Sequence, residues 1–216
     1  LEQLGVEAGN FLCVAFQQGR SGHCAVRTPA EGLEVDECLN GLVSWTNNAI
    51  LDVADTLGWD RFGLLGHSMG AGIASLLSAS VPQRVDRLVA IEALGALADE
   101  PGRTTAGLRD SLAAARSLRS TALRLDAGYV WSSDPRLTLP TLQRFTEPQV
   151  REVIAGIECP TRVVFANPPQ VYLPEPLRSE RAGLLPQGEL IVMDGTHHLH
   201  METPVAVASA IKGFFQ

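Results

Sequence analysis

Residues 62–77 read FGLLGHSMGAGIASLL, and this stretch decides the fold. An apolar run from Phe62 to Leu65 is followed by the pentapeptide GHSMG and then by small and apolar residues. That order predicts a strand, a tight turn and a helix, with the pattern Gly-x-Ser-x-Gly at the turn. Such a turn lifts a serine hydroxyl clear of the strand end, and the flanking glycines let strand and helix approach closely. Ser68 is therefore a candidate nucleophile, and the alternative is an ordinary turn with a surface serine.

The composition is typical of one soluble globular domain. The chain has 216 residues, of which 45% are hydrophobic and 19% charged, so it can bury one core. A net charge of −7 and the lack of any Lys/Arg cluster argue against nucleic acid or an anionic membrane as partner. No apolar run approaches the length of a membrane span. We predict a single domain over residues 1–216 that takes a small-molecule substrate, and leave its oligomeric state open.

The cysteines are widely spaced and show no C-x-x-C pattern, and no signal-like segment stands at the start of the sequence. We therefore expect free thiols in a reducing, cytoplasmic setting for Cys13, Cys24, Cys38 and Cys159.

Strands and helices alternate along the chain. Short apolar runs predict buried strands at residues 11–16, 62–65, 87–91, 161–166 and 190–193. Apolar residues at helical spacing predict one helix at 41–57 and another at 204–215, and a third helix is predicted directly after Ser68. This alternation predicts an α/β protein with a doubly wound, mostly parallel sheet, which places functional groups at the carboxyl ends of its strands.

The region 97–153 differs in character from the rest of the chain. Gly, Pro, Arg and Thr interrupt helical stretches such as 108–118, and no strand is evident. We expect a small helical cap inserted at residues 97–153, lying over the edge of the sheet.

A nucleophilic serine needs a base, which in the chain order Ser, acid, His would follow the last strand. Residues 195–202 there read GTHHLHME. His197 best occupies the loop tip, whereas His198 and His200 fall toward the terminal helix and remain alternatives. A metal site is a further alternative, but no acidic or thiolate ligands accompany the histidines and helical His pairs need i, i+4 spacing. We predict no metal and no cofactor.

The base in turn needs a carboxylate to orient it. The usual position is the loop after residues 161–166, but that loop reads NPPQVY and has no acid. Glu92 instead ends the strand that follows the Ser68 helix, in an apolar setting where an unpartnered carboxylate would be costly. A partner such as His197 would explain Glu92, and a structural glutamate bonded to backbone amides is the alternative. Glu175 and Glu180 are weaker candidates.

Negative charge on a substrate carbonyl must be met by donors, usually two backbone N–H groups. The first should be that of Met69, directly after the candidate nucleophile and at a helix amino end. The sequence does not reveal the second donor. His67 is expected to pack beside the turn.

These motifs together resemble the α/β-hydrolase fold family, and within it the serine hydrolase-like proteins. The resemblance runs from about residue 50 to the end and rests on the segments 58–62, 65–72, 82–88, 91–95 and 197–202. It implies that Ser68 is the nucleophile, that His197 is the base and that residues 97–153 are a cap shaping the pocket. Haloalkane dehalogenases share this fold and place their acid after the same strand as Glu92, but they carry aspartate at the turn, so Ser68 disfavours dehalogenation.

Typical members of the family have further strands and a His-Gly oxyanion loop at the amino end, so we expect this chain to be truncated there. The sequence predicts a serine hydrolase that cleaves a small carboxylic ester or related acyl compound without a cofactor. The alternative is a weak or inactive relative that binds a small molecule, because the oxyanion loop is missing. An acyltransferase would use the same residues with a different acceptor.

Overall fold

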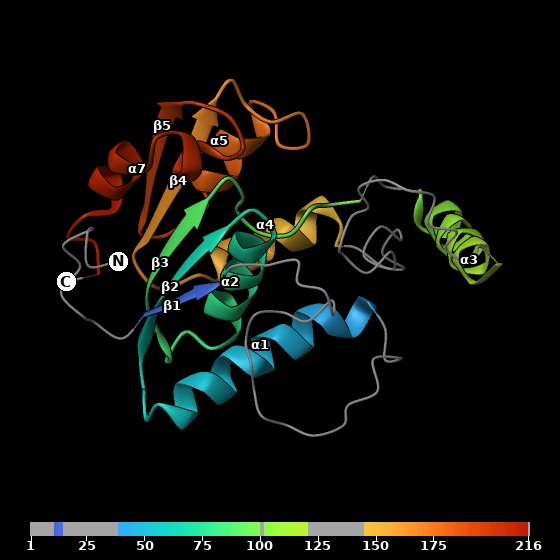
Figure 1. Ribbon diagram of the computed structural model, residues 1–216. Helices are drawn as coiled ribbons and strands as arrows, with labels where there is room; N and C mark the ends of the chain where they lie inside the picture. Colours follow the sequence, from blue (N-terminus) through green and yellow to red (C-terminus); the bar gives the residue numbers. More distant parts are fainter. Residues whose placement is uncertain (1–10, 15–38, 100–101, 121–144, 216) are drawn as a thin grey trace, which may run out of the picture.

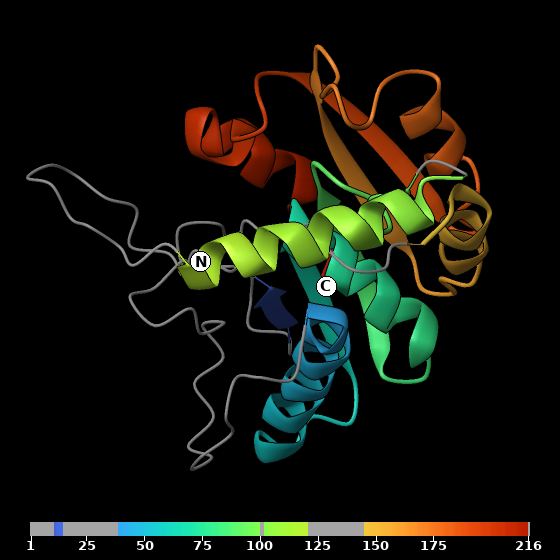
Figure 2. The same ribbon diagram turned by 90° about the vertical axis from the view of Figure 1, so that its right-hand side faces the viewer.

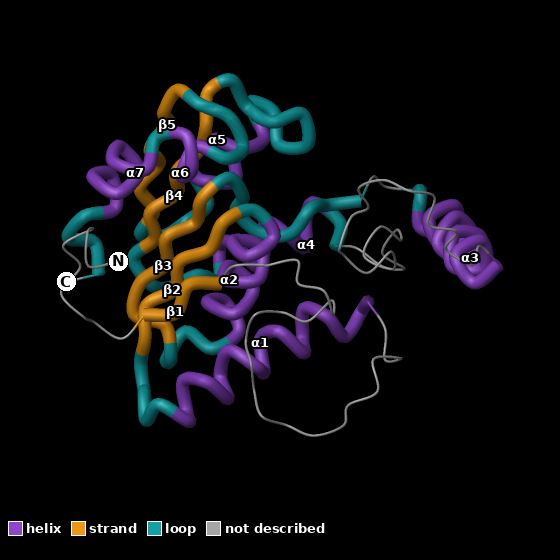
Figure 3. Tube along the Cα trace, viewed as in Figure 1, coloured by secondary structure: helices purple, strands orange, loops and turns teal. Residues whose placement is uncertain are grey.

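The computed structural model describes residues 11–14, 39–99, 102–120 and 145–215. Within them, five strands form one sheet, and each pairs in parallel with the next strand along the chain. Figure 3 shows the strands side by side. They are β1 (Phe11–Val14), β2 (Phe62–His67), β3 (Val85–Ile91), β4 (Thr161–Asn167) and β5 (Gly188–Asp194). The α/β fold predicted from the sequence is confirmed.

Helices connect the parallel strands, because parallel neighbours need a crossover rather than a tight turn. Figure 1 shows α1, α2 and α4 on one side of the sheet and α7 on the other, as expected of a doubly wound sheet. The helices are α1 (Leu39–Thr56), α2 (Met69–Ser80), α3 (Thr104–Ser120), α4 (Glu147–Ala155), α5 (Leu177–Ala182), α6 (Leu199–Glu202) and α7 (Pro204–Ile211).

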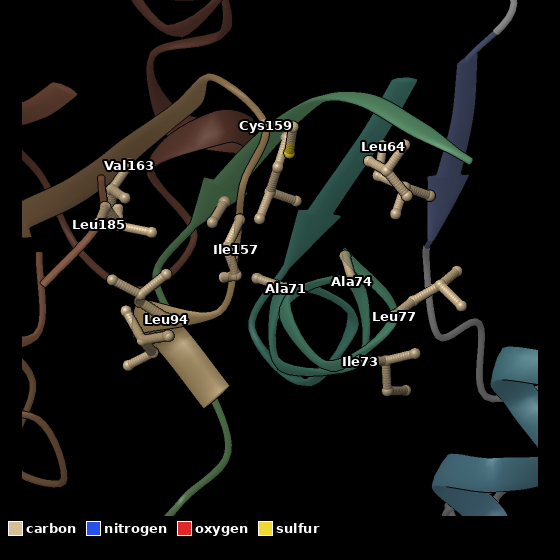
Figure 4. Packing of buried hydrophobic residues seen from close by; sticks show 14 of the residues in the cluster. Leu64, Ala71, Ile73, Ala74, Leu77, Leu94, Ile157, Cys159, Val163 and Leu185 are labelled. Atoms are coloured by element: carbon tan, nitrogen blue, oxygen red, sulfur yellow. The ribbon is translucent and has the colours of Figure 1, made fainter. Parts of the chain in front are cut away.

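Each face of the sheet has its own hydrophobic core. Side chains alternate between the faces along a strand, so Leu88 joins the cluster beneath α2 while Val89 joins the cluster beneath α7. Figure 4 shows the first cluster, in which α2 presents Ala71 and Ala74 to the sheet. Small residues let α2 lie close to the strands, which fixes the position of the turn at its amino end.

The carboxyl end of the chain departs from the single helix that the sequence predicts. Thr203 separates the short helix α6 from α7, which begins with Pro204 because proline is well suited to a first helical position. The helix ends at Ile211, and Gly213 follows with a φ of 75°. The predicted strand at residues 11–16 is described over Phe11–Val14, and positions 15 and 16 lie outside the described residues.

The two ends of the predicted insertion at residues 97–153 lie close together. Asp99 N–H donates to the carbonyl oxygen of Phe145 (2.9 Å), and Asp99 forms an isolated bridge with Thr146. Figures 1 and 2 show α3 apart from the sheet, on the same side as α2. The helix α4 instead contributes Val150 and Ile154 to the core beneath α2. This part of the predicted insertion therefore packs in the core, whereas the sequence predicted a position over the edge of the sheet. Residues 121–144 lie outside the described part, so the cap stays a prediction.

A buried arginine holds the segment that follows β3. Arg181 in α5 is 2% exposed and donates to the carbonyl oxygens of Leu94 and Ala96 at 3.0 Å each. Its guanidinium also pairs with the Glu147 carboxylate at 2.5 Å and lowers the pKa of that group. The arginine therefore ties α5, the start of α4 and the chain just beyond Glu92 into one unit.

No helix in the described part of the chain is long and apolar enough to cross a membrane. Cys159 is a buried free thiol, as predicted, and burial raises its pKa. The side chains of Cys13, Cys24 and Cys38 lie outside the described residues.

Candidate active site

Ser68 occupies a strained turn between β2 and α2. Its φ of 53° and ψ of −122° lie in a region that non-glycine residues rarely adopt. A Cβ atom on Gly66 would lie 2.5 Å from the carbonyl oxygen of Gly70 and 2.6 Å from the backbone nitrogen of Ala71. Only glycine fits at position 66, and this is the physical reason for the first glycine of the Gly-x-Ser-x-Gly motif. The Ser68 side chain does not cap α2, so its hydroxyl remains available to another partner.

That partner is His197, on the loop between β5 and α6. Its Nε2 atom lies 2.9 Å from Ser68 Oγ. His67 Nε2–H donates to the carbonyl oxygen of His197 at 2.7 Å, so this residue holds the main chain of His197 in addition to packing beside the turn. The Glu202 carboxylate accepts from the N–H of Thr196 at 3.0 Å and from its hydroxyl, and steadies the same loop. Of the three histidines that the sequence left open, the structure brings His197 to Ser68.

Glu92 follows β3 directly and is 2% exposed. One carboxylate oxygen accepts a hydrogen bond from the Ala166 N–H, and the other lies 3.4 Å from His197 Nδ1. The sequence suggested two roles for Glu92, a partner of His197 and a structural glutamate bonded to backbone amides, and each describes part of its environment. A backbone amide holds one oxygen, and the other oxygen faces the imidazole. Glu175 and Glu180 instead pair with Arg178 and Arg151.

Backbone strain coincides with these two positions. In the described ranges, two non-glycine residues have a positive φ. They are Ser68 and Glu92, and the φ of Glu92 is 60°. Each such conformation costs about 1–3 kcal/mol and persists only where the surrounding structure imposes it, most often at functional sites. Both lie at the carboxyl ends of neighbouring strands, where Ser68 N–H donates to the Ile91 carbonyl oxygen at 2.8 Å.

Tyr172 is a member of this group that the sequence analysis missed. Its hydroxyl lies 2.7 Å from His197 Nδ1, closer than the Glu92 carboxylate, and the two rings meet edge to face. Burial, together with the negative charge of Glu92, raises the pKa of Tyr172 to about 12. Tyr172 lies on the loop after β4, which is the usual position of the carboxylate. That position is the signal for it in the sequence, but acyl transfer ordinarily uses a carboxylate and not a phenol there.

Met69 is the first residue of α2, so its N–H has no acceptor within the helix. This N–H follows Ser68 directly and is suited to the oxyanion role predicted for it. Residues 15–38, which follow β1, lie outside the described residues, so the second oxyanion donor is not assigned.

Three further histidines form a cluster that begins at His67, the residue before Ser68. His67, His198 and His200 each offer a ring nitrogen within 4.8 Å of the others. Burial lowers the pKa of His67 to about 4 and also lowers the pKa of His200, so both rings are neutral at neutral pH. Local spacing in the sequence does not show this cluster, because His67 joins His198 and His200 from the end of β2.

Comparison with known proteins agrees with the fold. A family model described as alpha/beta hydrolase fold matches residues 31–150, which is more than half of the sequence. The chain belongs to the α/β-hydrolase fold family.

Its relatives include serine hydrolase-like proteins. One from Dictyostelium discoideum is 28% identical over 79% of this chain and 62% of its own length. Another, from Danio rerio, is 22% identical over 76% of this chain and 63% of its own length. The chain thus spans about three fifths of the length of these relatives. A solved structure of a hypothetical protein from Pseudomonas aeruginosa PAO1 is 29% identical, with a TM-score of 0.71 over 86% of this chain and 76% of that one.

Proposed function

We propose that this chain is a serine hydrolase that cleaves small carboxylic esters or related acyl compounds through an acyl-enzyme. The observation that carries the proposal is the distance of 2.9 Å between Ser68 Oγ and His197 Nε2, at a strained turn of the required kind. Nucleophile and base within hydrogen-bond reach, with a third group orienting the base, are what acyl transfer needs. The names of the serine hydrolase-like relatives are consistent with this chemistry.

In the first half-reaction, Ser68 Oγ attacks the ester carbonyl carbon while His197 Nε2 takes the hydroxyl proton. The negative charge that develops on the carbonyl oxygen faces the Met69 N–H. When the carbon–oxygen bond to the alcohol breaks, His197 returns the proton to the leaving alkoxide, and the acyl group stays on Ser68. Water then attacks the acyl carbon while His197 takes a proton from it, and His197 returns that proton to Ser68 Oγ as the acyl–oxygen bond breaks, which releases the carboxylic acid and the free serine.

Nδ1 of His197 must carry its hydrogen for Nε2 to accept the serine proton. The Glu92 carboxylate favours this tautomer, because its oxygens only accept and its negative charge stabilises the imidazolium that forms. The phenol oxygen of Tyr172 accepts from the same N–H at 2.7 Å. We assign Glu92 as the acid of the triad and Tyr172 as a positioning residue that helps hold the imidazole ring toward Ser68.

A fluorophosphonate probe tests the nucleophile directly, because it forms a covalent bond only with an activated serine. We expect one adduct per chain, found on the peptide containing Ser68 by mass spectrometry, and none in Ser68→Ala. Hydrolysis of a p-nitrophenyl ester should disappear with the adduct. Ser111, a buried serine of α3 outside the turn, provides the control: Ser111→Ala should label as the wild type does.

Labelling that survives Ser68→Ala would overturn the proposal. A wild-type protein that takes up no probe, yet binds small acyl compounds, would favour the binding-protein alternative. If an added amine or alcohol accepts the acyl group faster than water does, the same residues serve an acyltransferase.

Replacing Tyr172 with phenylalanine should lower kcat about three- to tenfold. The change removes one hydrogen bond of about 0.5–1.5 kcal/mol from the base while Glu92 still orients it. Because the pKa of Tyr172 is raised to about 12, the phenol stays neutral across the assayed pH range. The ratio of wild-type to variant kcat should therefore stay constant from about pH 5 to about pH 8, the range in which histidine changes its charge, without an extra alkaline limb. An increase in kcat would show instead that Tyr172 competes with Glu92 for Nδ1.

A further inference from the structure

Three histidines form a cluster next to the proposed triad, and among the described residues none of the three side chains bonds the Ser68 hydroxyl or the Glu92 carboxylate. His67 stands at the end of β2, His198 precedes α6 and His200 lies within it, and one ring nitrogen from each falls within 4.8 Å of the others. The ring centroids of His67 and His200 are 4.1 Å apart, and that of His198 is 5.7 Å from His67 and 6.2 Å from His200. The side chain of His197 is not part of this set.

The hydrogen bonding of His67 leaves one nitrogen ready to bind a cation. Its Nε2 faces the carbonyl oxygen of His197 at 2.7 Å, and a carbonyl oxygen only accepts, so Nε2 carries the hydrogen. In the neutral ring Nδ1 then has a free lone pair. Metal-binding histidines commonly donate their other ring N–H to a backbone carbonyl in this way, which fixes the tautomer and the orientation of the ring.

His200 provides a second, independent observation. Its Nδ1 atom is buried and has no hydrogen-bond partner among the described residues. Buried polar atoms are nearly always satisfied, and one that lacks a partner calls for an unseen water or ion. His198 is exposed, so its ring can turn toward an ion without disturbing the core.

We propose that His67, His198 and His200 together bind one divalent transition-metal ion, namely Zn²⁺. Three imidazole ligands suit zinc, whose bonds to nitrogen are about 2.0–2.1 Å long. Nitrogens on one tetrahedral ion lie roughly 3.4 Å apart by that geometry, so ring nitrogens now within 4.8 Å must draw together by up to about 1.4 Å on binding. A water molecule would complete the four-coordinate shell. This site is separate from the proposed hydrolase function, which needs no metal.

Titration of the full chain, freed of any purification tag and treated with chelator, tests the site. Isothermal titration with ZnCl2 should give one ion per chain at micromolar affinity, and Co²⁺ should give the intense visible absorption of a tetrahedral complex. His198→Ala removes an exposed ligand with little effect on folding, and we expect it to weaken binding at least about 100-fold, because even the loss of an outer-shell partner costs 10- to 100-fold. His200→Gln should weaken binding similarly, with the melting temperature followed for both variants.

The matched control is His197→Ala. It removes the neighbouring imidazole but keeps the backbone carbonyl that holds His67, so the affinity for Zn²⁺ should remain within about threefold of the wild type. Absence of one-to-one binding in the wild type, or unchanged binding in His198→Ala, would refute the site. Loss of binding in His197→Ala would place the ion on the proposed catalytic base and would equally overturn the three-histidine site. Because these readouts need no substrate, they stand independently of the hydrolase proposal.

Discussion

Replacing His197 with alanine is expected to lower kcat for p-nitrophenyl acetate by about 10⁵-fold, close to the effect of removing the nucleophile itself. Without this imidazole, Ser68 loses the one base that lies within hydrogen-bond distance (2.9 Å) of its hydroxyl among the described residues, and a neutral serine hydroxyl is a poor nucleophile. KM should change little, because the side chain contributes to the transition state rather than to ground-state binding. Steady-state kinetics on purified protein measure both constants.

Substituting the two neighbouring histidines in the same way tests the assignment of His197 as the base. His198→Ala and His200→Ala should lose at most about tenfold in kcat, since neither bonds Ser68. The ordering of the three losses is the decisive result. If His198→Ala or His200→Ala is as damaging as His197→Ala in metal-free buffer, the base has been assigned to the wrong histidine.

Glu92→Gln is expected to lower kcat by about 10⁴-fold, with the fold retained. The amide keeps the shape of the side chain but removes the negative charge 3.4 Å from His197 Nδ1. Where its NH2 group faces Nδ1, it donates and favours the tautomer in which Nε2 carries the hydrogen, which cannot accept the serine proton. The loss should fall on kcat, as measured with the same ester, and the melting temperature should show that the variant is folded.

Glu180→Gln is the matched control, because this carboxylate was a weaker candidate from the sequence and is exposed, where it pairs with Arg151. A surface ion pair contributes about 0–1 kcal/mol to stability, so activity and melting temperature should stay near those of the wild type. Retention of more than a tenth of the activity by Glu92→Gln would mean that Tyr172 orients the base by itself and that Glu92 is a structural glutamate.

The fold was accessible from the sequence because its signals are local. The apolar run before Ser68 and the small residues after it belong to one continuous segment, and the sheet follows from the repeated alternation of strand and helix. The need for glycine at position 66 was likewise predictable from the sequence. A Cβ atom there would clash with the backbone of residues 70 and 71, which belong to the same turn. Predictions were weaker where helices depend on packing: the sequence analysis did not specify α4, which the core beneath α2 stabilises.

The contacts of the candidate site were only partly predictable. Ser68, His197 and Glu92 were selected because their residue types are those that acyl transfer uses and because each follows a predicted strand. Their meeting at one edge follows from the parallel sheet, which brings the carboxyl ends of all strands together. Tyr172 could not be identified this way, because a tyrosine after a strand has many ordinary structural roles and only its 2.7 Å distance to Nδ1 assigns one.

The sequence by itself determined the Gly-x-Ser-x-Gly turn, the order of strands and helices, and the residue types available for chemistry, because these depend on neighbours a few positions apart. The tertiary structure decided which of three histidines faces Ser68, that Glu92 turns one oxygen to a backbone amide and the other to the imidazole, and that Tyr172 approaches the same nitrogen. It also brought His67 to His198 and His200. These contacts join residues more than 70 positions apart in most cases, so their distances are set by the packing of the helices on the sheet.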